Sequence, residues 1–210
     1  MNSNKKRMAL IFDCDGVMFD SRQANINFYN HILDHFGLPP MTGDKIDFVH
    51  THTADDSISY IFQGTDYASR AREFRLGIDY SPFIKDMVME EGLRELLMRL
   101  KPIFGLAVAT SRSNTIGNVL QSFGLDEFFD IVISSLDVAS PKPHPESLFR
   151  IMDFFGIGPG DSLYVGDSMV DYRTARAAGV KFISFKNPAL DADYHADSMG
   201  EIWDIAERCL

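Results

Sequence analysis

The sequence is poor in residues that could tie a fold together covalently or around a soft metal ion. Its 210 residues include two cysteines, Cys14 and Cys209, and six histidines. So few cysteines give no disulfide framework and no zinc-ligand cluster, and this usage is typical of a reducing compartment. We therefore expect a cytoplasmic protein whose fold depends on its hydrophobic core.

Long apolar runs and an excess of positive charge are also missing. The apolar run at residues 8–12 stops at Asp13, too short for a signal peptide or a membrane span. The formal net charge of −10 would repel a phosphodiester backbone and an anionic bilayer. We expect neither nucleic acid nor a membrane as a partner, and an anionic ligand would need a local positive site. The sequence does not indicate an oligomeric state.

What the sequence does contain is a regular alternation of strand-like and helix-like segments. Apolar runs of strand length lie at residues 8–12, 104–109, 131–133, 162–165 and 181–185. Between them, residues 93–100, 116–123 and 148–155 space their apolar side chains by three or four, as amphipathic helices do. This alternation predicts an α/β fold, a Rossmann-like parallel sheet with helices on both faces.

The alternation is interrupted between residues 21 and 87. This stretch has no convincing strand but several short amphipathic patterns, one of which contains Ile26, Tyr29 and Leu33 and stops near Gly37. We therefore expect an inserted all-helical cap domain at 21–87, and a catalytic core formed by 1–20 together with 88–210.

Polar side chains follow the predicted strands, and in an open α/β sheet ligands bind beyond the carboxyl ends of the strands. The first four runs are followed in turn by these residues: Asp13 and Asp15; Thr110 and Ser111; Lys142, at some distance; and Asp167. Three converging carboxylates without thiolates or a histidine cluster form an oxygen-only site, which favours Mg²⁺ over zinc. A lysine and a hydroxyl beside them suit a phosphoryl group, which a carboxylate can attack.

These motifs resemble those of the haloacid dehalogenase superfamily over nearly the whole chain. The first motif, DxDG, matches residues 13–16. The resemblance implies that Asp13 is the nucleophile and a metal ligand. It also implies that Asp15 is the general acid and then the base, with its backbone carbonyl reaching the metal.

The other three motifs follow in order. The resemblance implies that Thr110 and the backbone amide of Ser111 bind phosphate, and that Lys142, within a run of prolines, is both catalytic and substrate-binding. In the GDxxxD motif at 166–171, it implies that Asp167 is a metal ligand and Asp171 an orienting carboxylate. The helical insertion resembles the small cap of the phosphoglycolate phosphatase and β-phosphoglucomutase branch.

Cap residues that could select the substrate stay undecided. His50 and His52 could recognise an acidic substrate, but exposed loop histidines are the more common case. Arg70, Arg72 and Arg75 could bind a substrate carboxylate, although most arginines on such a helix are solvated. None of the five is assigned to the site.

The resulting hypothesis is a magnesium-dependent phosphatase that hydrolyses a small phosphomonoester, such as a phosphoglycolate-like compound or a sugar phosphate, through an aspartyl-phosphate. A β-phosphoglucomutase-like phosphotransferase is an alternative, disfavoured because Ser21 and Asn25 stand where the mutases have an FDT segment and a hinge histidine. A non-catalytic regulatory module is a second alternative, and the intact carboxylates Asp13, Asp15 and Asp167 argue against it.

Overall fold

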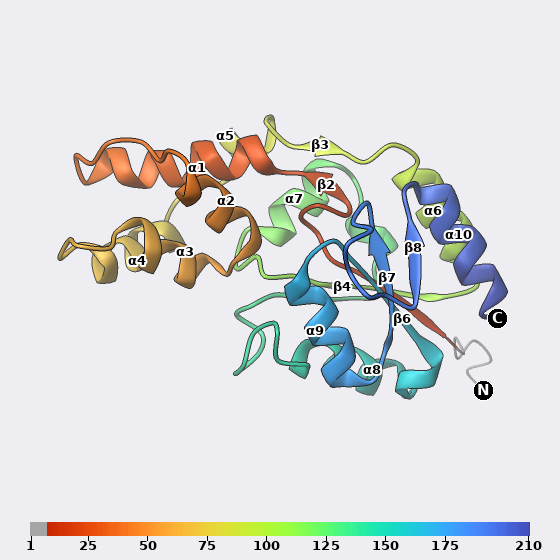
Figure 1. Ribbon diagram of the computed structural model, residues 1–210. Coiled ribbons are helices and arrows are strands. Elements are labelled where there is room, and N and C mark those ends of the chain that lie inside the picture. Colours follow the sequence, from red (N-terminus) through yellow and green to blue (C-terminus); the bar gives the residue numbers. More distant parts are fainter. Residues whose placement is uncertain (1–7) are drawn as a thin grey trace.

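The computed structural model describes residues 8–210, apart from the side chains of His50 and Thr51. Its elements form two parts, a sheet covered by helices and a helical lobe beside it (Figure 1). None of the helices in the described part of the chain is both long and apolar enough to cross a membrane.

Within residues 8–210 the main sheet has six strands in the order β5-β4-β1-β6-β7-β8, and every neighbouring pair is parallel. These strands are β1 (Ala9–Phe12), β4 (Gly105–Ala109), β5 (Ile131–Ile133), β6 (Ser162–Gly166), β7 (Lys181–Phe185) and β8 (Tyr194–Ala196). The first five confirm the predicted runs. Sequence analysis missed β8 because an edge strand of three residues, one of them buried, shows no apolar run.

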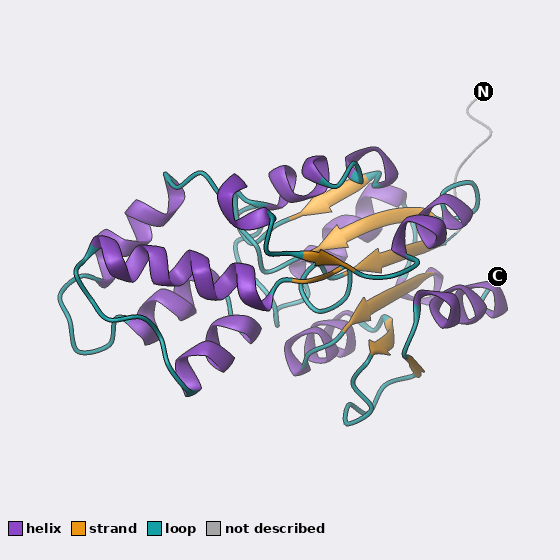
Figure 2. Ribbon diagram, turned by 90° about the horizontal axis from the view of Figure 1, so that it is seen from above, coloured by secondary structure: helices purple, strands orange, loops and turns teal. Residues whose placement is uncertain are grey.

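The two faces of the sheet are buried by different helices, as predicted. Leu10 and Phe12 belong to a cluster shared with α6 (Leu93–Leu100), α7 (Ile116–Ser122) and α10 (Met199–Arg208). Ala9 and Ile11 belong to a second cluster with α8 (Glu146–Phe155) and α9 (Met169–Ala178). Successive residues of a strand face opposite sides, so β1 contributes to both cores, and Figure 2 shows helices on both sides of the strands.

The lobe consists of α1 (Arg22–His35), α2 (Asp44–Thr51), α3 (Ala54–Ile61), α4 (Ala68–Leu76) and α5 (Ser81–Ile84). The chain enters it through β2 (Phe19–Asp20) and leaves through β3 (Val88–Met89), which pair with each other antiparallel. Ala24, Phe28 and Ile32, spaced by four on α1, are buried in a cluster continuous with the first face of the sheet. Helical periodicity thus gives the lobe an apolar interior.

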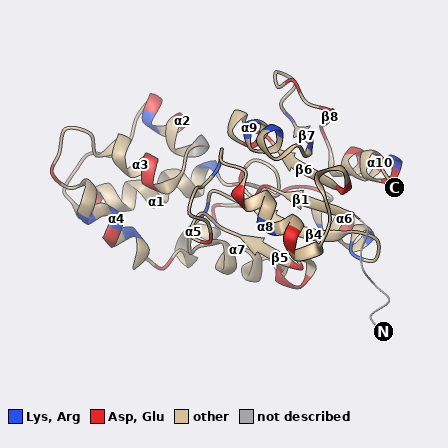
Figure 3. Ribbon diagram, turned by 90° about the horizontal axis from the view of Figure 1, so that it is seen from below, with Lys and Arg blue, Asp and Glu red and all other residues tan. Residues whose placement is uncertain are grey.

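Charged residues are spread along both parts of the ribbon (Figure 3). Both cysteines are free thiols, and Cys14 is completely buried. Burial raises the pKa of the Cys14 thiol well above its ordinary value, so this side chain behaves as a small apolar core residue.

Candidate active site

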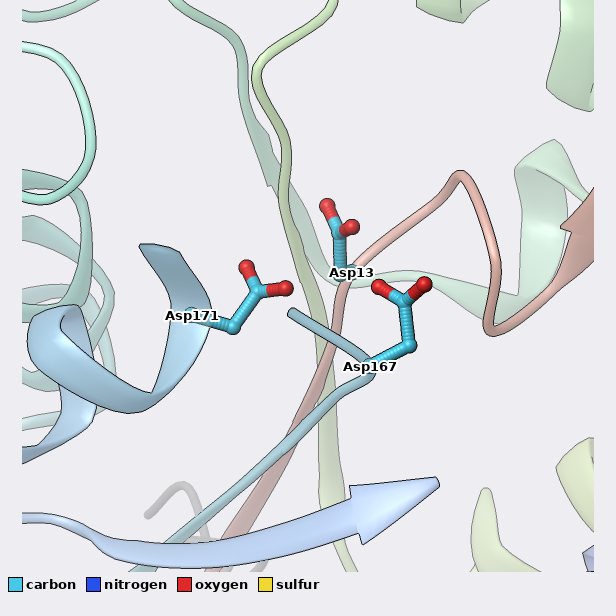
Figure 4. Close-up of side chains that lie close together, drawn as sticks. All are labelled: Asp13, Asp167 and Asp171. Atoms are coloured by element: carbon cyan, nitrogen blue, oxygen red, sulfur yellow. The ribbon is translucent and has the colours of Figure 1, made fainter. Parts of the chain in front are cut away.

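Three acidic side chains, Asp13, Asp167 and Asp171, lie together at the carboxyl edge of the sheet (Figure 4). Each offers one carboxylate oxygen, and these oxygens all lie within 4.8 Å of one another. Asp13 follows β1 and Asp167 follows β6, and these two strands are hydrogen-bonded neighbours. Strand pairing therefore brings together residues that are separated by more than two-thirds of the chain.

Lys142 lies at the centre of a hydrogen-bond network that includes two of these three aspartates. Its Nζ donates to Asp13 Oδ1 at 2.8 Å, to Asp171 Oδ1 at 2.7 Å and to the Tyr164 hydroxyl at 3.0 Å. The Tyr164 hydroxyl donates in turn to Asp171 Oδ1 at 2.7 Å. All four side chains are buried, so each contact is made in a low-dielectric setting. The ammonium is held in place by acceptors directly after β1, on β6 and on α9, and by the backbone carbonyl of Ala109 on β4.

Asp171 has no free carboxylate oxygen for a ligand without breaking a hydrogen bond. Its Oδ2 accepts from the Ser168 hydroxyl at 2.6 Å and from the Ser168 backbone N–H at 3.2 Å. Ser168 Oγ accepts from the Asp171 backbone N–H, which completes a capping box at the start of α9. With Oδ1 bound to Lys142 and Tyr164, this carboxylate orients the lysine and begins the helix.

The three carboxylates of the cluster differ in the direction in which their surroundings shift their pKa values. Burial raises the pKa of Asp13 against the opposing effect of the Lys142 ammonium, and burial with the nearby Asp171 raises the pKa of Asp167 to about 7. Burial would also raise the pKa of Asp171, but Lys142 and the hydrogen bonds from Ser168 and Tyr164 hold it below its ordinary value. Asp13 and Asp167 are therefore the two that gain most from a nearby cation.

Asp15 is paired with an arginine that sequence analysis did not single out. Arg112 Nε donates to Asp15 Oδ2 at 2.8 Å, and its second terminal nitrogen donates to Asp15 Oδ1 at 2.6 Å. The Arg112 guanidinium is buried and lies 5.0 Å from the centre of the Tyr80 ring. Burial lowers the pKa of Arg112, but the adjacent Asp15 carboxylate more than offsets this and raises it well above its ordinary value. This is a bidentate, charge-assisted ion pair.

The residues after β4 lie where expected but differ in access. Ser111 lines the pocket described below, whereas Thr110 is buried, is not among the lining residues, and accepts a hydrogen bond from the Arg112 backbone N–H through Oγ1 at 3.1 Å. The assignment of these two residues to phosphate binding stays a prediction.

A pocket lies between the lobe and the carboxyl edge of the sheet. Its core side is lined by Asp13, Asp15, Ser111, Arg112, Lys142, Asp167 and Asp171, and its lobe side by Asn25, Tyr29, His52, Arg75 and Tyr80. The carboxylate cluster thus opens into a cavity that both parts of the protein enclose. A small ligand bound there would contact both.

Of the lobe residues left undecided by the sequence, some line the pocket and others do not. Arg75 is buried and lines the pocket, and the exposed His52 lines it while stacking on Phe48. Arg70 lies against Phe36, and Arg72 donates to Ser59 Oγ at 2.6 Å. Neither of these two arginines is a pocket residue, and the His50 side chain lies outside the described residues.

Arg112 and Tyr164 are the site residues that sequence reasoning missed. Arg112 stands two residues beyond Thr110, so a basic residue in that loop was a visible signal. Tyr164 lies within an apolar run, and a buried tyrosine normally needs a partner for its hydroxyl, but the sequence does not show which.

Comparison with known proteins identifies the family of this chain. The family model described as haloacid dehalogenase-like hydrolase matches residues 10–185. A pyrophosphatase of Halalkalibacterium halodurans is 30% identical, over 93% of this chain and 95% of its own. A phosphoglycolate phosphatase of Chromobacterium violaceum is 27% identical, over 95% of this chain and 96% of its own.

A solved structure has the same overall fold. A haloacid dehalogenase superfamily hydrolase of subfamily IA from Geobacter sulfurreducens superposes with a TM-score of 0.84 and is 41% identical. The alignment covers 94% of this chain and 98% of that one. The resemblance expected from the four motifs is confirmed, and the chain belongs to the haloacid dehalogenase-like hydrolase family.

Proposed function

We propose that this protein is a Mg²⁺-dependent phosphatase that hydrolyses a small phosphomonoester through an aspartyl-phosphate on Asp13. The observation that carries the proposal is the Asp13 carboxylate itself. It is buried, held through one oxygen by Lys142, grouped with Asp167 and Asp171, and lines the pocket. Relatives named phosphoglycolate phosphatase and pyrophosphatase support this class of reaction.

The donor set suits a hard divalent cation. Asp13 and Asp167 offer carboxylate oxygens and carry raised pKa values, whereas the oxygens of Asp171 already accept hydrogen bonds. We assign Asp13 and Asp167 as side-chain ligands, with the backbone carbonyl of Asp15 as a third. A bound Mg²⁺ would neutralise the repulsion between the carboxylate nucleophile and an anionic phosphate.

Three residues of the chain have distinct roles in the proposed reaction. The free oxygen of Asp13 attacks phosphorus while the bond to the leaving oxygen breaks, and Lys142 holds the Asp13 carboxylate and attracts the phosphate. Asp15 gives a proton to the leaving oxygen. In the second half, Asp15 takes a proton from water, whose oxygen attacks phosphorus and releases Asp13 as a free carboxylate.

Asp15 needs freedom to act in both steps. In the structure both of its oxygens accept hydrogen bonds from Arg112. We propose that substrate binding loosens one of these contacts, and that the lobe at 21–87 acts as a cap on the core formed by 1–20 and 88–210. The two free cysteines support a cytoplasmic location.

The proposal is tested by substituting the nucleophile. Asp13→Asn should abolish Mg²⁺-dependent phosphate release from an aryl phosphate, because an amide cannot form the acyl phosphate. Asp153→Asn, which changes an exposed aspartate in α8, is the matched control and should keep full activity. Circular dichroism checks that both variants are folded. Turnover retained by Asp13→Asn would refute the mechanism.

A further inference from the structure

The lobe side of the pocket contains a buried arginine that the proposed chemistry does not use. Arg75, near the end of α4, is 6% exposed and lines the same pocket as Asp13 and Lys142. One of its terminal nitrogens donates to Ser113 Oγ at 3.1 Å. Ser113 follows Ser111 and Arg112 in the loop after β4, so Arg75 lies beside the predicted phosphate-binding loop.

The guanidinium of Arg75 is incompletely paired. Its other terminal nitrogen donates to Asp55 at 2.7 Å, but the Asp55 side chain is 64% exposed. Its Nε is buried and has no hydrogen-bond partner among the residues that the structure describes. A buried charge whose counter-ion lies in water is poorly compensated, and an unpaired buried donor is costly. A further acceptor with negative charge would satisfy both needs.

The other strong cations of the pocket already have carboxylate partners that are buried or mostly buried. Lys142 is bound by Asp13 and Asp171, and Arg112 is bound by both oxygens of Asp15. Among the described lysines and arginines that line the pocket, Arg75 is the one paired only with an exposed carboxylate. It is therefore the cation best able to attract a further anionic group in a protein of net charge −10.

We propose that Arg75 binds a second anionic group of the substrate, an inference that rests on the proposed function. The substrate is then a small phosphomonoester that carries a carboxylate or another phosphate close to the phosphate that is cleaved. Neutral hydroxyls, such as those of a sugar phosphate, would leave the guanidinium poorly compensated.

Neighbouring polar groups fit the same kind of ligand. Asn25 and Tyr29 line the lobe side of this pocket, and Asn114 lines its core side. Burial raises the pKa of Tyr29 to about 12, so its hydroxyl keeps its proton at neutral pH and can donate to an anion. Besides Arg75, the lobe side of the pocket thus offers the Tyr29 hydroxyl as a hydrogen-bond donor for an oxyanion.

The test compares two substrates that differ by one charge. With Mg²⁺ and the full chain, kcat/KM is measured for 2-phosphoglycolate and for its neutral amide, with p-nitrophenyl phosphate as a general phosphatase substrate. The wild-type protein should prefer the acid by at least about tenfold. Arg75→Met should lower kcat/KM for the acid by about 10- to 100-fold, the range expected for a lost charged hydrogen bond. It should change turnover of the amide by less than about threefold.

Two further variants serve as controls. Arg70→Met removes an exposed arginine from the same helix, outside the pocket, and should change neither substrate. Arg75→Lys keeps the charge without the planar fork and should restore part of the preference for the acid. Pyrophosphate tests whether the second anion can be a phosphate. If Arg75→Met lowers kcat/KM for pyrophosphate alone, for phosphoglycolate alone or for both, the affected substrate shows which anion Arg75 binds, and each of these results supports the inference.

The outcomes separate this inference from the proposed function. If the wild-type protein hydrolyses the acid, its amide and pyrophosphate with similar values of kcat/KM, the second anion site is refuted while the phosphatase stands. An equal loss of both matched substrates in Arg75→Met assigns that residue a structural role and also refutes it. Absence of phosphate release from the acid, its amide, pyrophosphate and p-nitrophenyl phosphate alike refutes the phosphatase itself, and the inference with it. If Arg75→Met does not fold, the wild-type comparison of acid with amide decides.

Discussion

At the scale of single residues, the feature with the largest consequence is the ion pair between Asp15 and Arg112. The Arg112 side chain is 6% exposed and that of Asp15 is 19% exposed, so water screens the pair weakly. Two parallel hydrogen bonds fix the orientation of the Asp15 carboxylate. Arg112 is therefore a positioning residue for the proposed acid and base.

Arg112→Met should lower the stability of the protein and its phosphatase activity together. Loss of the charged hydrogen bonds should reduce the free energy of unfolding by about 1.5–3 kcal/mol, because Asp15 is left without its counter-ion. Urea unfolding at pH 7 measures this, and phosphate release measures the activity. Arg150→Met, which removes a half-exposed arginine paired with Glu146, should change stability by less than about 0.5 kcal/mol.

A double-mutant cycle with Asp15→Asn distinguishes the pair from two independent effects. If the pair carries the energy, the cost of Arg112→Met should fall clearly when Asp15 is already neutral. Additive costs within about 0.5 kcal/mol would show that the two side chains stabilise the fold separately.

Residue types and strand-end positions were enough to predict much of the cluster. Asp13, Asp167, Asp171 and Lys142 lie together because parallel strands expose their carboxyl ends at one edge. The pairing of Asp15 with Arg112 could not be predicted, since the path of the loop after β4 is set by packing against Tyr80 and Met87.

At the scale of elements, the turn after β1 requires a glycine for two reasons. Gly16 has a φ of +79°, in the left-handed region that side chains rarely adopt. A Cβ built on Gly16 would lie 2.0 Å from Asp167 Oδ2. The turn therefore passes directly against a proposed metal ligand, and the absence of a side chain allows Asp167 its position.

Gly16→Ala should weaken metal binding more than it weakens the fold. The Asp167 carboxylate can swing away from the new methyl group, but it then leaves the cluster. The Mg²⁺ concentration for half-maximal phosphatase activity should rise by at least about tenfold, the change that about 1.4 kcal/mol of lost affinity produces. Activity measured over a Mg²⁺ titration checks this.

Gly37→Ala is the control for backbone strain. Gly37 has a φ of +68°, and no atom lies within 4 Å of a Cβ built there. It should cost stability of about 1 kcal/mol through strain alone and leave the Mg²⁺ dependence unchanged. An equal Mg²⁺ dependence in the two alanine variants would contradict the proposed contact between the turn and the metal ligand.

At the scale of the whole molecule, the cluster links metal binding to stability. An Asp167 pKa raised by burial to about 7 lies above the ordinary carboxyl value, so folding favours the protonated form. This contribution to stability is complete at low pH and is lost as the pH rises through about 7. Above that pH the metal-free protein carries the full repulsion of the cluster.

Asp167→Asn should therefore raise the melting temperature of the metal-free protein at pH 8, and much less at pH 5. Added Mg²⁺ should raise the melting temperature of the wild-type protein. At a hundredfold excess over its dissociation constant, Mg²⁺ should increase the free energy of unfolding by about 2.7 kcal/mol. The same addition should not stabilise Asp167→Asn. Thermal unfolding in EDTA and in Mg²⁺ checks both. A Mg²⁺-induced shift of equal size in the variant would remove Asp167 from the metal site.

The sequence by itself determined the α/β core, because apolar runs of strand length and helices of period 3.6 are properties of local chain segments. It also determined which acids stand at strand ends. Only the tertiary structure decided that Arg112 pairs with Asp15. It also decided that Arg75, and not Arg70 or Arg72, lines the pocket. These contacts join residues 97 positions apart, or the lobe with the core. They depend on how separately folded elements pack, and no local pattern encodes that.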